Sequence, residues 1–184
     1  GSRSKFHEEY NMKMAYWCLL LLAISGCGDG APQTEFGSLK SVERYRDDLE
    51  MIIVEANAIE QELWERAVGS TGRATGQNLA PVYQELKPRL VALIVDLDDI
   101  AVPHKLLETH DELRSALGLR LEASDLVIAG WTTEQQQGYD EAQPLYADAE
   151  KKVDEANALL AAVSEVLLEV DIALAEAEGR TLVG

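Results

Sequence analysis

Apolar side chains recur at alternating intervals of four and three residues along the last part of the chain. This stripe consists of Ala142, Tyr146, Ala149, Val153, Ala156, Leu160, Val163, Leu167, Val170 and Leu174. The positions between them are largely acidic, as at Asp154, Glu155 and Glu169. An α-helix places residues with this spacing on one face, so the pattern predicts a long helix with a buried face and an acidic face.

Three earlier segments carry shorter stripes with helical spacing. The first consists of Leu39, Val42, Tyr45, Leu49, Ile52, Ala56, Ile59 and Leu63. The second consists of Leu79, Tyr83, Leu86, Leu90, Leu93, Leu97 and Ile100. The third consists of Leu106, His110, Leu113, Leu117, Leu121 and Ile128. Strand signals are scarce, so we expect an all-α chain with four amphipathic helices.

Helix breakers separate the four stripes. Gly69–Gly76 predicts a flexible loop after the first helix, and Pro103 suits the first turn of the third. Gly130 is expected to close the third helix, and Thr133-x-x-Gln136 resembles a capping box for the fourth. Together these signals predict helices near 38–68, 78–101, 103–130 and 133–178.

Two prolines lie inside the helical pattern. Pro88 has no amide hydrogen to bond the carbonyl of Gln84, so the second helix is expected to kink there or to begin afresh. Pro144 is expected near the start of the fourth helix, with Asp140 as an alternative N-cap. Gly179 is placed as a C-terminal stop.

Short connections force neighbouring helices to run antiparallel. The predicted architecture is therefore an antiparallel up-down-up-down four-helix bundle with a long C-terminal helix. Because this last helix is longer than the second and third, one of its ends is expected to overhang the bundle. The overhang would offer an uncovered apolar stripe to a partner helix or to a second copy of the chain.

The N-terminal part of the chain has the order of a secretory signal. Lys13 follows Met12, an apolar run covers residues 14–24, and the small pair Ser25-Gly26 precedes Cys27. A helix over this run is about 16 Å long, roughly half the thickness of the hydrocarbon core. We therefore expect the run to be removed rather than to remain as a membrane span.

Ile24-Ser25-Gly26-Cys27 resembles the lipobox of bacterial lipoproteins, in which an aliphatic residue and two small residues precede the modified cysteine. The resemblance implies that residues 12–26 are a lipoprotein signal peptide, that cleavage occurs before Cys27, and that this cysteine carries a diacylglyceryl group. Two or three acyl chains anchor a protein stably where one does not. The other interpretations are an ordinary signal peptide with a coincidental cysteine, or a buried apolar helix.

The rest of the expected division follows from these features. Residues 1–11 include two acids and fit a signal peptide poorly, so they are expected to be an upstream extension or a tag remnant. Residues 27–37 form a polar tether, 38–178 the helical bundle and 179–184 a tail. In double-membraned bacteria an Asp after the lipidated cysteine resembles an inner-membrane retention signal. This chain has Gly28 there, which favours the outer membrane.

Charge restricts the partners. The chain has a formal net charge of −17 at pH 7, so it repels phosphate backbones and anionic headgroups. Direct nucleic-acid binding is therefore not expected. Of the two cysteines, Cys18 lies inside the apolar run and Cys27 ends it. They form no CxxC motif, so we assign them to targeting rather than to a disulfide or metal site.

Candidate chemistry in the helical part is weak. His104 and His110, with Glu108, Asp111 and Glu112 nearby, suggest a metal site, but histidines six positions apart point about 240° apart around a helix. His110 also lies on the apolar stripe, which is typical of a core histidine. We expect no metal site and no cofactor.

No catalytic residues are expected either. The other groups considered are an acidic motif, a Ser–Asp pair, two tryptophans near helix ends and a glycine-rich loop: Asp96-x-Asp98-Asp99, Ser124-Asp125, Trp64, Trp131 and Gly69–Gly76. None matches a nucleophile with its base, a phosphate loop or a zinc-protease motif. We therefore interpret the acidic motif as a solvated turn and the tryptophans as part of the bundle packing. Cys27 is the one functional site that the sequence predicts.

The sequence therefore predicts a non-enzymatic, lipid-anchored envelope protein on the periplasmic side, acting as a structural adaptor or accessory subunit of a membrane complex. The half of the chain from Pro103 onward is also similar to uncharacterised helical-bundle lipoproteins of bacteria, a likeness that implies the class but no mechanism. The alternative is a periplasmic module that binds a small ligand or metal between its helices, where a kink at Pro88 would open a cavity.

Overall fold

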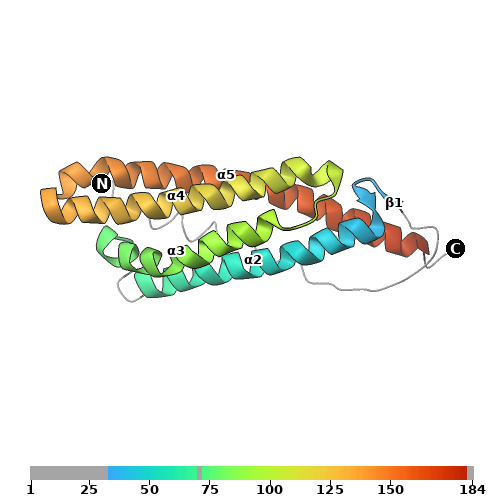
Figure 1. Ribbon diagram of the computed structural model, residues 1–184, viewed down its shortest axis with the longest axis horizontal. Helices are drawn as coiled ribbons and strands as arrows, with labels where there is room; N and C mark the ends of the chain where they lie inside the picture. The colour runs from blue at the N-terminus through green and yellow to red at the C-terminus, as the bar shows by residue number, and fades with distance from the viewer. Residues whose placement is uncertain (1–32, 70–71, 182–184) are drawn as a thin grey trace.

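The computed structural model describes residues 33–69 and 72–181. The described chain is an all-α bundle, as predicted (Figure 1). Its four helices are α2 (Leu39–Ala67), α3 (Gly76–Asp98), α4 (Leu107–Gln137) and α5 (Tyr139–Thr181). Two short strands, β1 (Gln33–Thr34) and β2 (Gly37–Ser38), precede α2, and a 3-10 turn, η2 (His104–Leu106), precedes α4.

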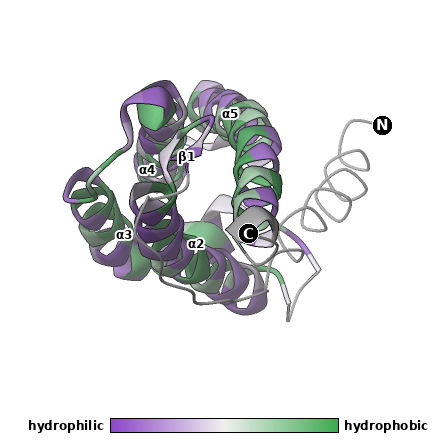
Figure 2. Cartoon of the chain, turned by 90° about the vertical axis from the view of Figure 1, so that its right-hand side faces the viewer, coloured by the Kyte–Doolittle hydropathy of each residue, from purple (hydrophilic) through white to green (hydrophobic). Residues whose placement is uncertain are grey.

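Successive helices run in opposite directions, so the bundle is antiparallel with up-down-up-down order (Figure 1). Viewed along its length, the four helices surround a common interior (Figure 2). Contact is most extensive between α4 and α5, intermediate for α3 with α4 and α2 with α3, and slight between α2 and α5. The α2–α5 side is therefore the loosest of the four seams.

Local sequence explains where two of the helices begin. The hydroxyl of Ser38 accepts a hydrogen bond from the amide of Ser41 at 3.3 Å, and Thr75 does the same for Asn78 at 3.3 Å. Such side chains satisfy amides that the first turn of a helix leaves unpaired.

The predicted apolar stripes form the core. No member of the four stripes is exposed, and Tyr45, Leu49, Leu97 and Val170 are completely or almost completely buried. The heptad pattern of the last helix was therefore a reliable guide to its buried face. Helix α4 also buries small residues that the predicted stripe does not include, namely Ala116, Ala123, Ser124 and Gly130.

The predicted end of the third helix is wrong. Gly130 lies inside α4, which continues to Gln137, and Thr133 is a helical residue rather than an N-cap. Gly138, whose φ of 101° favours glycine, makes the break instead. Gly130 is required for another reason: a Cβ there would lie 2.6 Å from Cε1 of Tyr146 on α5.

The predicted restart at Pro88 is also wrong. Helix α3 runs through this proline without interruption. Pro88 is exposed, so water can satisfy the carbonyl of Gln84 that would otherwise lose its hydrogen bond. Pro144 lies near the start of α5, as expected, but Asp140 is in the first turn of this helix and is not its N-cap.

The overhang is present, but its stripe is covered. At one end of the bundle the α4–α5 hairpin reaches beyond the turn between α2 and α3 (Figure 1). Ala142 and Ala149 on α5 are nevertheless buried, because α4 is longer than predicted and packs along them. The expectation of an uncovered apolar stripe at this overhang is therefore wrong.

Candidate functional site

An arginine crosses the interior of the bundle. Arg120 lies on α4, yet its Nη1 donates to Oε1 of Glu60 on α2 at 2.8 Å, and its Nη2 donates to Oδ1 of Asn157 on α5 at 2.7 Å. Only 16% of the Arg120 side chain is exposed. One guanidinium thus links three helices and spans the loose α2–α5 seam.

A cavity of about 130 Å³ lies beside this guanidinium and receives side chains from all four helices. Aliphatic residues dominate its lining, among them Leu86, Leu90, Leu113 and Leu117, all of which are buried. Half-buried residues of α2 and α5 line the seam side, namely Ile53, Asn57, Asn157 and Leu160. Apolar side chains thus line most of the cavity, and the polar side chains of Asn57 and Asn157 lie on its α2–α5 side.

Side-chain size explains why the cavity lies on this side. Small residues recur every seventh position along the contact between α4 and α5: Ala116, Ala123 and Gly130 on α4, and Ala142, Ala149 and Ala156 on α5. Small side chains let two helices approach closely. Across the α2–α5 seam contact is slight, and long side chains link the helices. Besides Arg120, Arg46 donates to Asp171 at 2.8 Å.

The outward side of α5 has a different character. Leu168 and Ile172 are one helical turn apart and are 53% and 52% exposed. Glu165 and Glu169, also one turn apart, are exposed beside them. We call these four residues the α5 outer face. It combines apolar contact area with negative charge, which is a combination found at docking surfaces.

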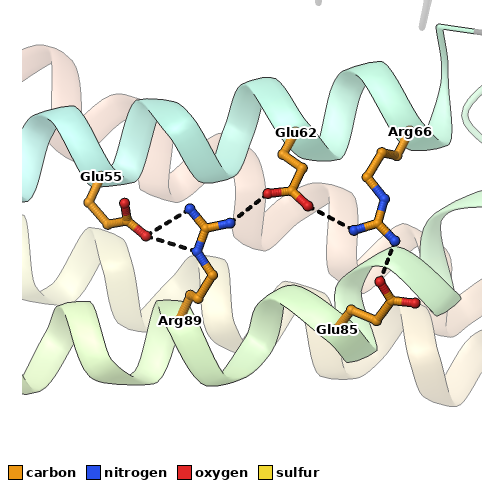
Figure 3. Close-up of polar contacts among 5 residues, drawn as sticks. All are labelled: Glu55, Glu62, Arg66, Glu85 and Arg89. Carbon is orange, nitrogen blue, oxygen red and sulfur yellow. Dashed lines mark hydrogen bonds and ion pairs between the residues drawn. The ribbon is translucent and has the colours of Figure 1, made fainter.

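Alternating charges join α2 to α3 on the outside of the bundle. Figure 3 shows this ladder: Glu55, Arg89, Glu62, Arg66 and Glu85 follow one another across the two helices. Arg89 donates to Glu55 at 2.9 Å and to Glu62 at 2.5 Å. Hydrogen bonds from Arg66 and Arg89 hold the pKa of the Glu62 carboxyl below its usual range. The charged side chains of the ladder are paired with one another, so we assign the ladder to the pairing of α2 with α3.

The histidine on the third stripe is a core residue, as the pattern indicated. His110 is 6% exposed, and its Nδ1 lies 3.5 Å from the hydroxyl of the fully buried Tyr45. Burial lowers the pKa of the His110 imidazole and raises the pKa of the Tyr45 hydroxyl. His104 is exposed in η2, away from this contact. Within residues 33–69 and 72–181, no three His, Cys, Asp or Glu side chains come together as metal ligands would.

The remaining sequence candidates are not brought together. Asp98 accepts from Arg114 at 2.5 Å, which holds the pKa of Asp98 below its usual range. Ser124 donates to the backbone carbonyl of Leu121 at 2.7 Å, whereas its sequence neighbour Asp125 is ion-paired with Lys87. The Ser–Asp pair is therefore divided between core and surface.

Both tryptophans are half-buried and pack against hydrophobic clusters, Trp64 against the main core and Trp131 against a smaller one around Ala123. The glycine-rich loop lies between α2 and α3, and its residues 70–71 are outside the described part of the chain. Cys27 and the whole lipobox also lie outside the described residues, so the lipidation site stays a prediction.

Sequence reasoning missed the polar residues that lie at the α2–α5 side of the cavity. A signal was present, because Asn57 and Asn157 each directly follow a stripe alanine, Ala56 and Ala156, and asparagine is a poor helix former. Arg120 similarly lies next to the stripe residue Leu121. Polar residues next to an apolar stripe were thus the sequence signal for the polar part of the cavity lining.

The chain matches no protein-family model, no curated protein and no solved structure. Among the described helices, none combines the length and the apolar character needed to cross a membrane.

Proposed function

We propose that this protein is a lipid-anchored, non-enzymatic adaptor that docks a basic amphipathic segment of another envelope protein. The α5 outer face carries the proposal. Leu168 and Ile172 leave apolar surface exposed on a helix whose other apolar stripe is already buried. This exposed apolar pair offers contact area that the bundle itself does not use.

Charge defines the chemistry of that partner. Glu165 and Glu169 lie beside the apolar pair, and the whole chain carries a net charge of −17. A second copy of the chain would bring the same negative charge against this face. A segment that combines apolar residues with Lys or Arg along one edge complements both features, and such complementarity raises the association rate as well as specificity.

The anchor is the acylated Cys27 that the lipobox resemblance implies. Cys27 and Gln33 are six positions apart, and an extended chain of that length covers about 20 Å. The β1 end of the bundle would therefore stay close to the membrane. Helix α5 has 43 residues and is about 65 Å long, so its far end can reach well away from the bilayer. The favoured location is the periplasmic side of the outer membrane.

The docking proposal is tested with two matched double variants of the full chain in its native membrane. Leu168→Ser with Ile172→Ser removes the apolar pair of the α5 outer face. Val91→Ser with Val95→Ser removes a pair that is also one turn apart and exposed, but lies on α3. Each protein is purified in mild detergent, and crosslinked peptides are identified by mass spectrometry.

We expect a stoichiometric partner that crosslinks to α5 through a Lys- or Arg-rich amphipathic segment. This partner should be lost from the α5 variant and retained by the α3 variant. Retention by both variants, loss from both, or crosslinks only to a second copy of this chain would each overturn the proposal.

The anchor has its own test. Intact mass of the protein from its native membrane should show loss of residues 1–26 and the added mass of a diacylglyceryl group. Cys27→Ala should abolish both changes and release the protein from the membrane fraction. An unprocessed, unacylated wild-type chain would contradict lipidation at Cys27. It would not decide whether the α5 outer face binds a partner, which the crosslinking experiment tests.

A further inference from the structure

The cavity beside Arg120 has the size and lining of a binding site for a small hydrocarbon group. Its volume is about 130 Å³, and its walls are mainly leucine and isoleucine side chains from α2, α3 and α4. An apolar cavity of roughly 150 Å³ stays dry and accepts a molecule the size of benzene. A group of about six carbons therefore fits this one.

The α2–α5 seam keeps the cavity from closing. Helices collapse onto a void when their facing side chains are apolar and adaptable. Here long polar side chains bridge the seam, from Arg120 to Glu60 and Asn157, and from Arg46 to Asp171. Because the bridges consist of long polar side chains, closing the seam would bury or break them.

The polar group that suits the entrance is uncharged. The positive charge of Arg120 is already matched by Glu60, whose Oε1 is 2.8 Å from Nη1 of the guanidinium. An incoming carboxylate would have to displace Glu60 or lie beside it, and two carboxylates sharing one site repel each other. A hydroxyl can donate to the Glu60 carboxylate and accept from the amide of Asn57 or Asn157 without breaking the bridge.

We propose that this cavity binds a small uncharged amphiphile with a hydrocarbon body of about six carbons and a hydroxyl at the α2–α5 seam. The hydrocarbon occupies the space among the leucines, and the hydroxyl lies at the entrance near Glu60 and Asn157. This site shares no residue with the α5 outer face, so the two proposals fail or succeed separately.

The test uses the full chain with ¹³C-labelled isoleucine and leucine methyl groups, titrated with hexan-1-ol and, in parallel, with hexanoate. These probes have the same chain length and differ in charge. Hexan-1-ol should give saturable shifts at methyl groups of the lining, such as those of Ile53 and Leu117, and hexanoate should bind at least tenfold more weakly. Shifts that do not saturate or that spread over the surface, or hexanoate binding as tightly as the alcohol, would overturn the proposal.

Cavity-filling variants locate the site. Ala56→Leu places a larger side chain in the lining, and Ala92→Leu makes the same change at an exposed position on α3. The first should weaken hexan-1-ol binding at least tenfold, and the second should leave it unchanged. Ile53→Phe at the half-buried entrance gives a second blocking variant in case Ala56→Leu does not fold. Unchanged binding in a folded blocking variant would show that the alcohol binds elsewhere.

Discussion

At the scale of single residues, a tyrosine ring occupies the space that a side chain at position 130 would need. Tyr146 lies against Gly130 on α4 and against Gly76 at the start of α3, and its hydroxyl donates to Glu134 at 2.8 Å. Glycine is unfavourable inside a helix by roughly 1 kcal/mol relative to alanine. The structure accepts this cost at Gly130 because the ring packs where a Cβ would be.

This packing predicts opposite effects for two glycines of the same helix. Gly130→Ala should lower the free energy of unfolding by about 1–3 kcal/mol, because overpacking against Tyr146 outweighs the gain in helix propensity. At Gly118 a Cβ would meet nothing within 4 Å, so Gly118→Ala should raise the free energy of unfolding by up to about 1 kcal/mol. Urea unfolding followed by circular dichroism measures both. A stabilising Gly130→Ala would contradict the packing argument.

His110 predicts a pH dependence of stability. Burial is the main cause that lowers the pKa of its imidazole, with a smaller contribution from Arg114, against the opposing influence of Asp111 and Asp98. As the pH falls through the ordinary histidine range near 6.5, the unfolded chain binds a proton before the folded chain does. The folded state therefore loses stability as the pH falls, until the pH drops below the lowered pKa and both states are protonated.

Comparison of urea unfolding at pH 7.5 and pH 5.5 tests this for the wild type and for His110→Gln. The wild type should lose more stability over this interval than the variant. The Asp98 carboxyl does not interfere, because Arg114 keeps its pKa below the usual range and it titrates at lower pH. Equal losses in both proteins would mean that His110 does not contribute.

At the scale of the elements, the charge ladder between α2 and α3 predicts a salt-sensitive pairing. Arg89 bridges Glu55 and Glu62, but the participating side chains are well exposed, so solvent and salt screen them. Arg89→Gln should lower the free energy of unfolding slightly at low ionic strength, and the difference from wild type should shrink in 0.5 M NaCl. A difference that persists in high salt would indicate that packing of the arginine stem, not charge, is responsible.

The elements also show what the sequence could and could not reveal. The stripe on α5 was predictable because apolar residues recur along it at helical spacing without interruption, and none of them is exposed. The end of α4 was not, because Gly130 has the local appearance of a helix stop. Its actual role depends on Tyr146, a residue of the next helix. Local propensity cannot show that a helix continues because a tertiary neighbour requires a glycine there.

The candidate site was predictable only in part. The sequence suggested that a ligand could lie between the helices but attributed the opening to a kink at Pro88, and α3 continues through this exposed proline. Leu86 and Leu90, on either side of Pro88, do line the cavity, which also coincides with the contrast between the alanine-lined α4–α5 contact and the bridged α2–α5 seam. That contrast involves facing residues from different helices, such as Glu60 and Asn157, and appears only once the helices are packed.

At the scale of the whole molecule, the bundle closes on three sides by apolar contact and on the fourth by bridges. Arg120 donates hydrogen bonds from α4 to both α2 and α5, through Glu60 and Asn157. Arg120→Met keeps much of the apolar stem and removes both bonds, leaving Glu60 and Asn157 at the seam without the guanidinium. Hydrogen bonds to charged groups contribute more than neutral ones, so the free energy of unfolding should fall by about 1–3 kcal/mol.

The matched control is Arg114→Met, because Arg114 also holds an aspartate but does so at the surface, with 52% of its side chain exposed. The free energy of unfolding should fall clearly less in Arg114→Met than in Arg120→Met. A double-mutant cycle of Arg120→Met with Glu60→Gln should give a coupling energy well above zero, since the two side chains act as one bridge. If the two losses simply add, the Arg120–Glu60 pair contributes no coupling at the α2–α5 seam, and this bridge does not keep the cavity open.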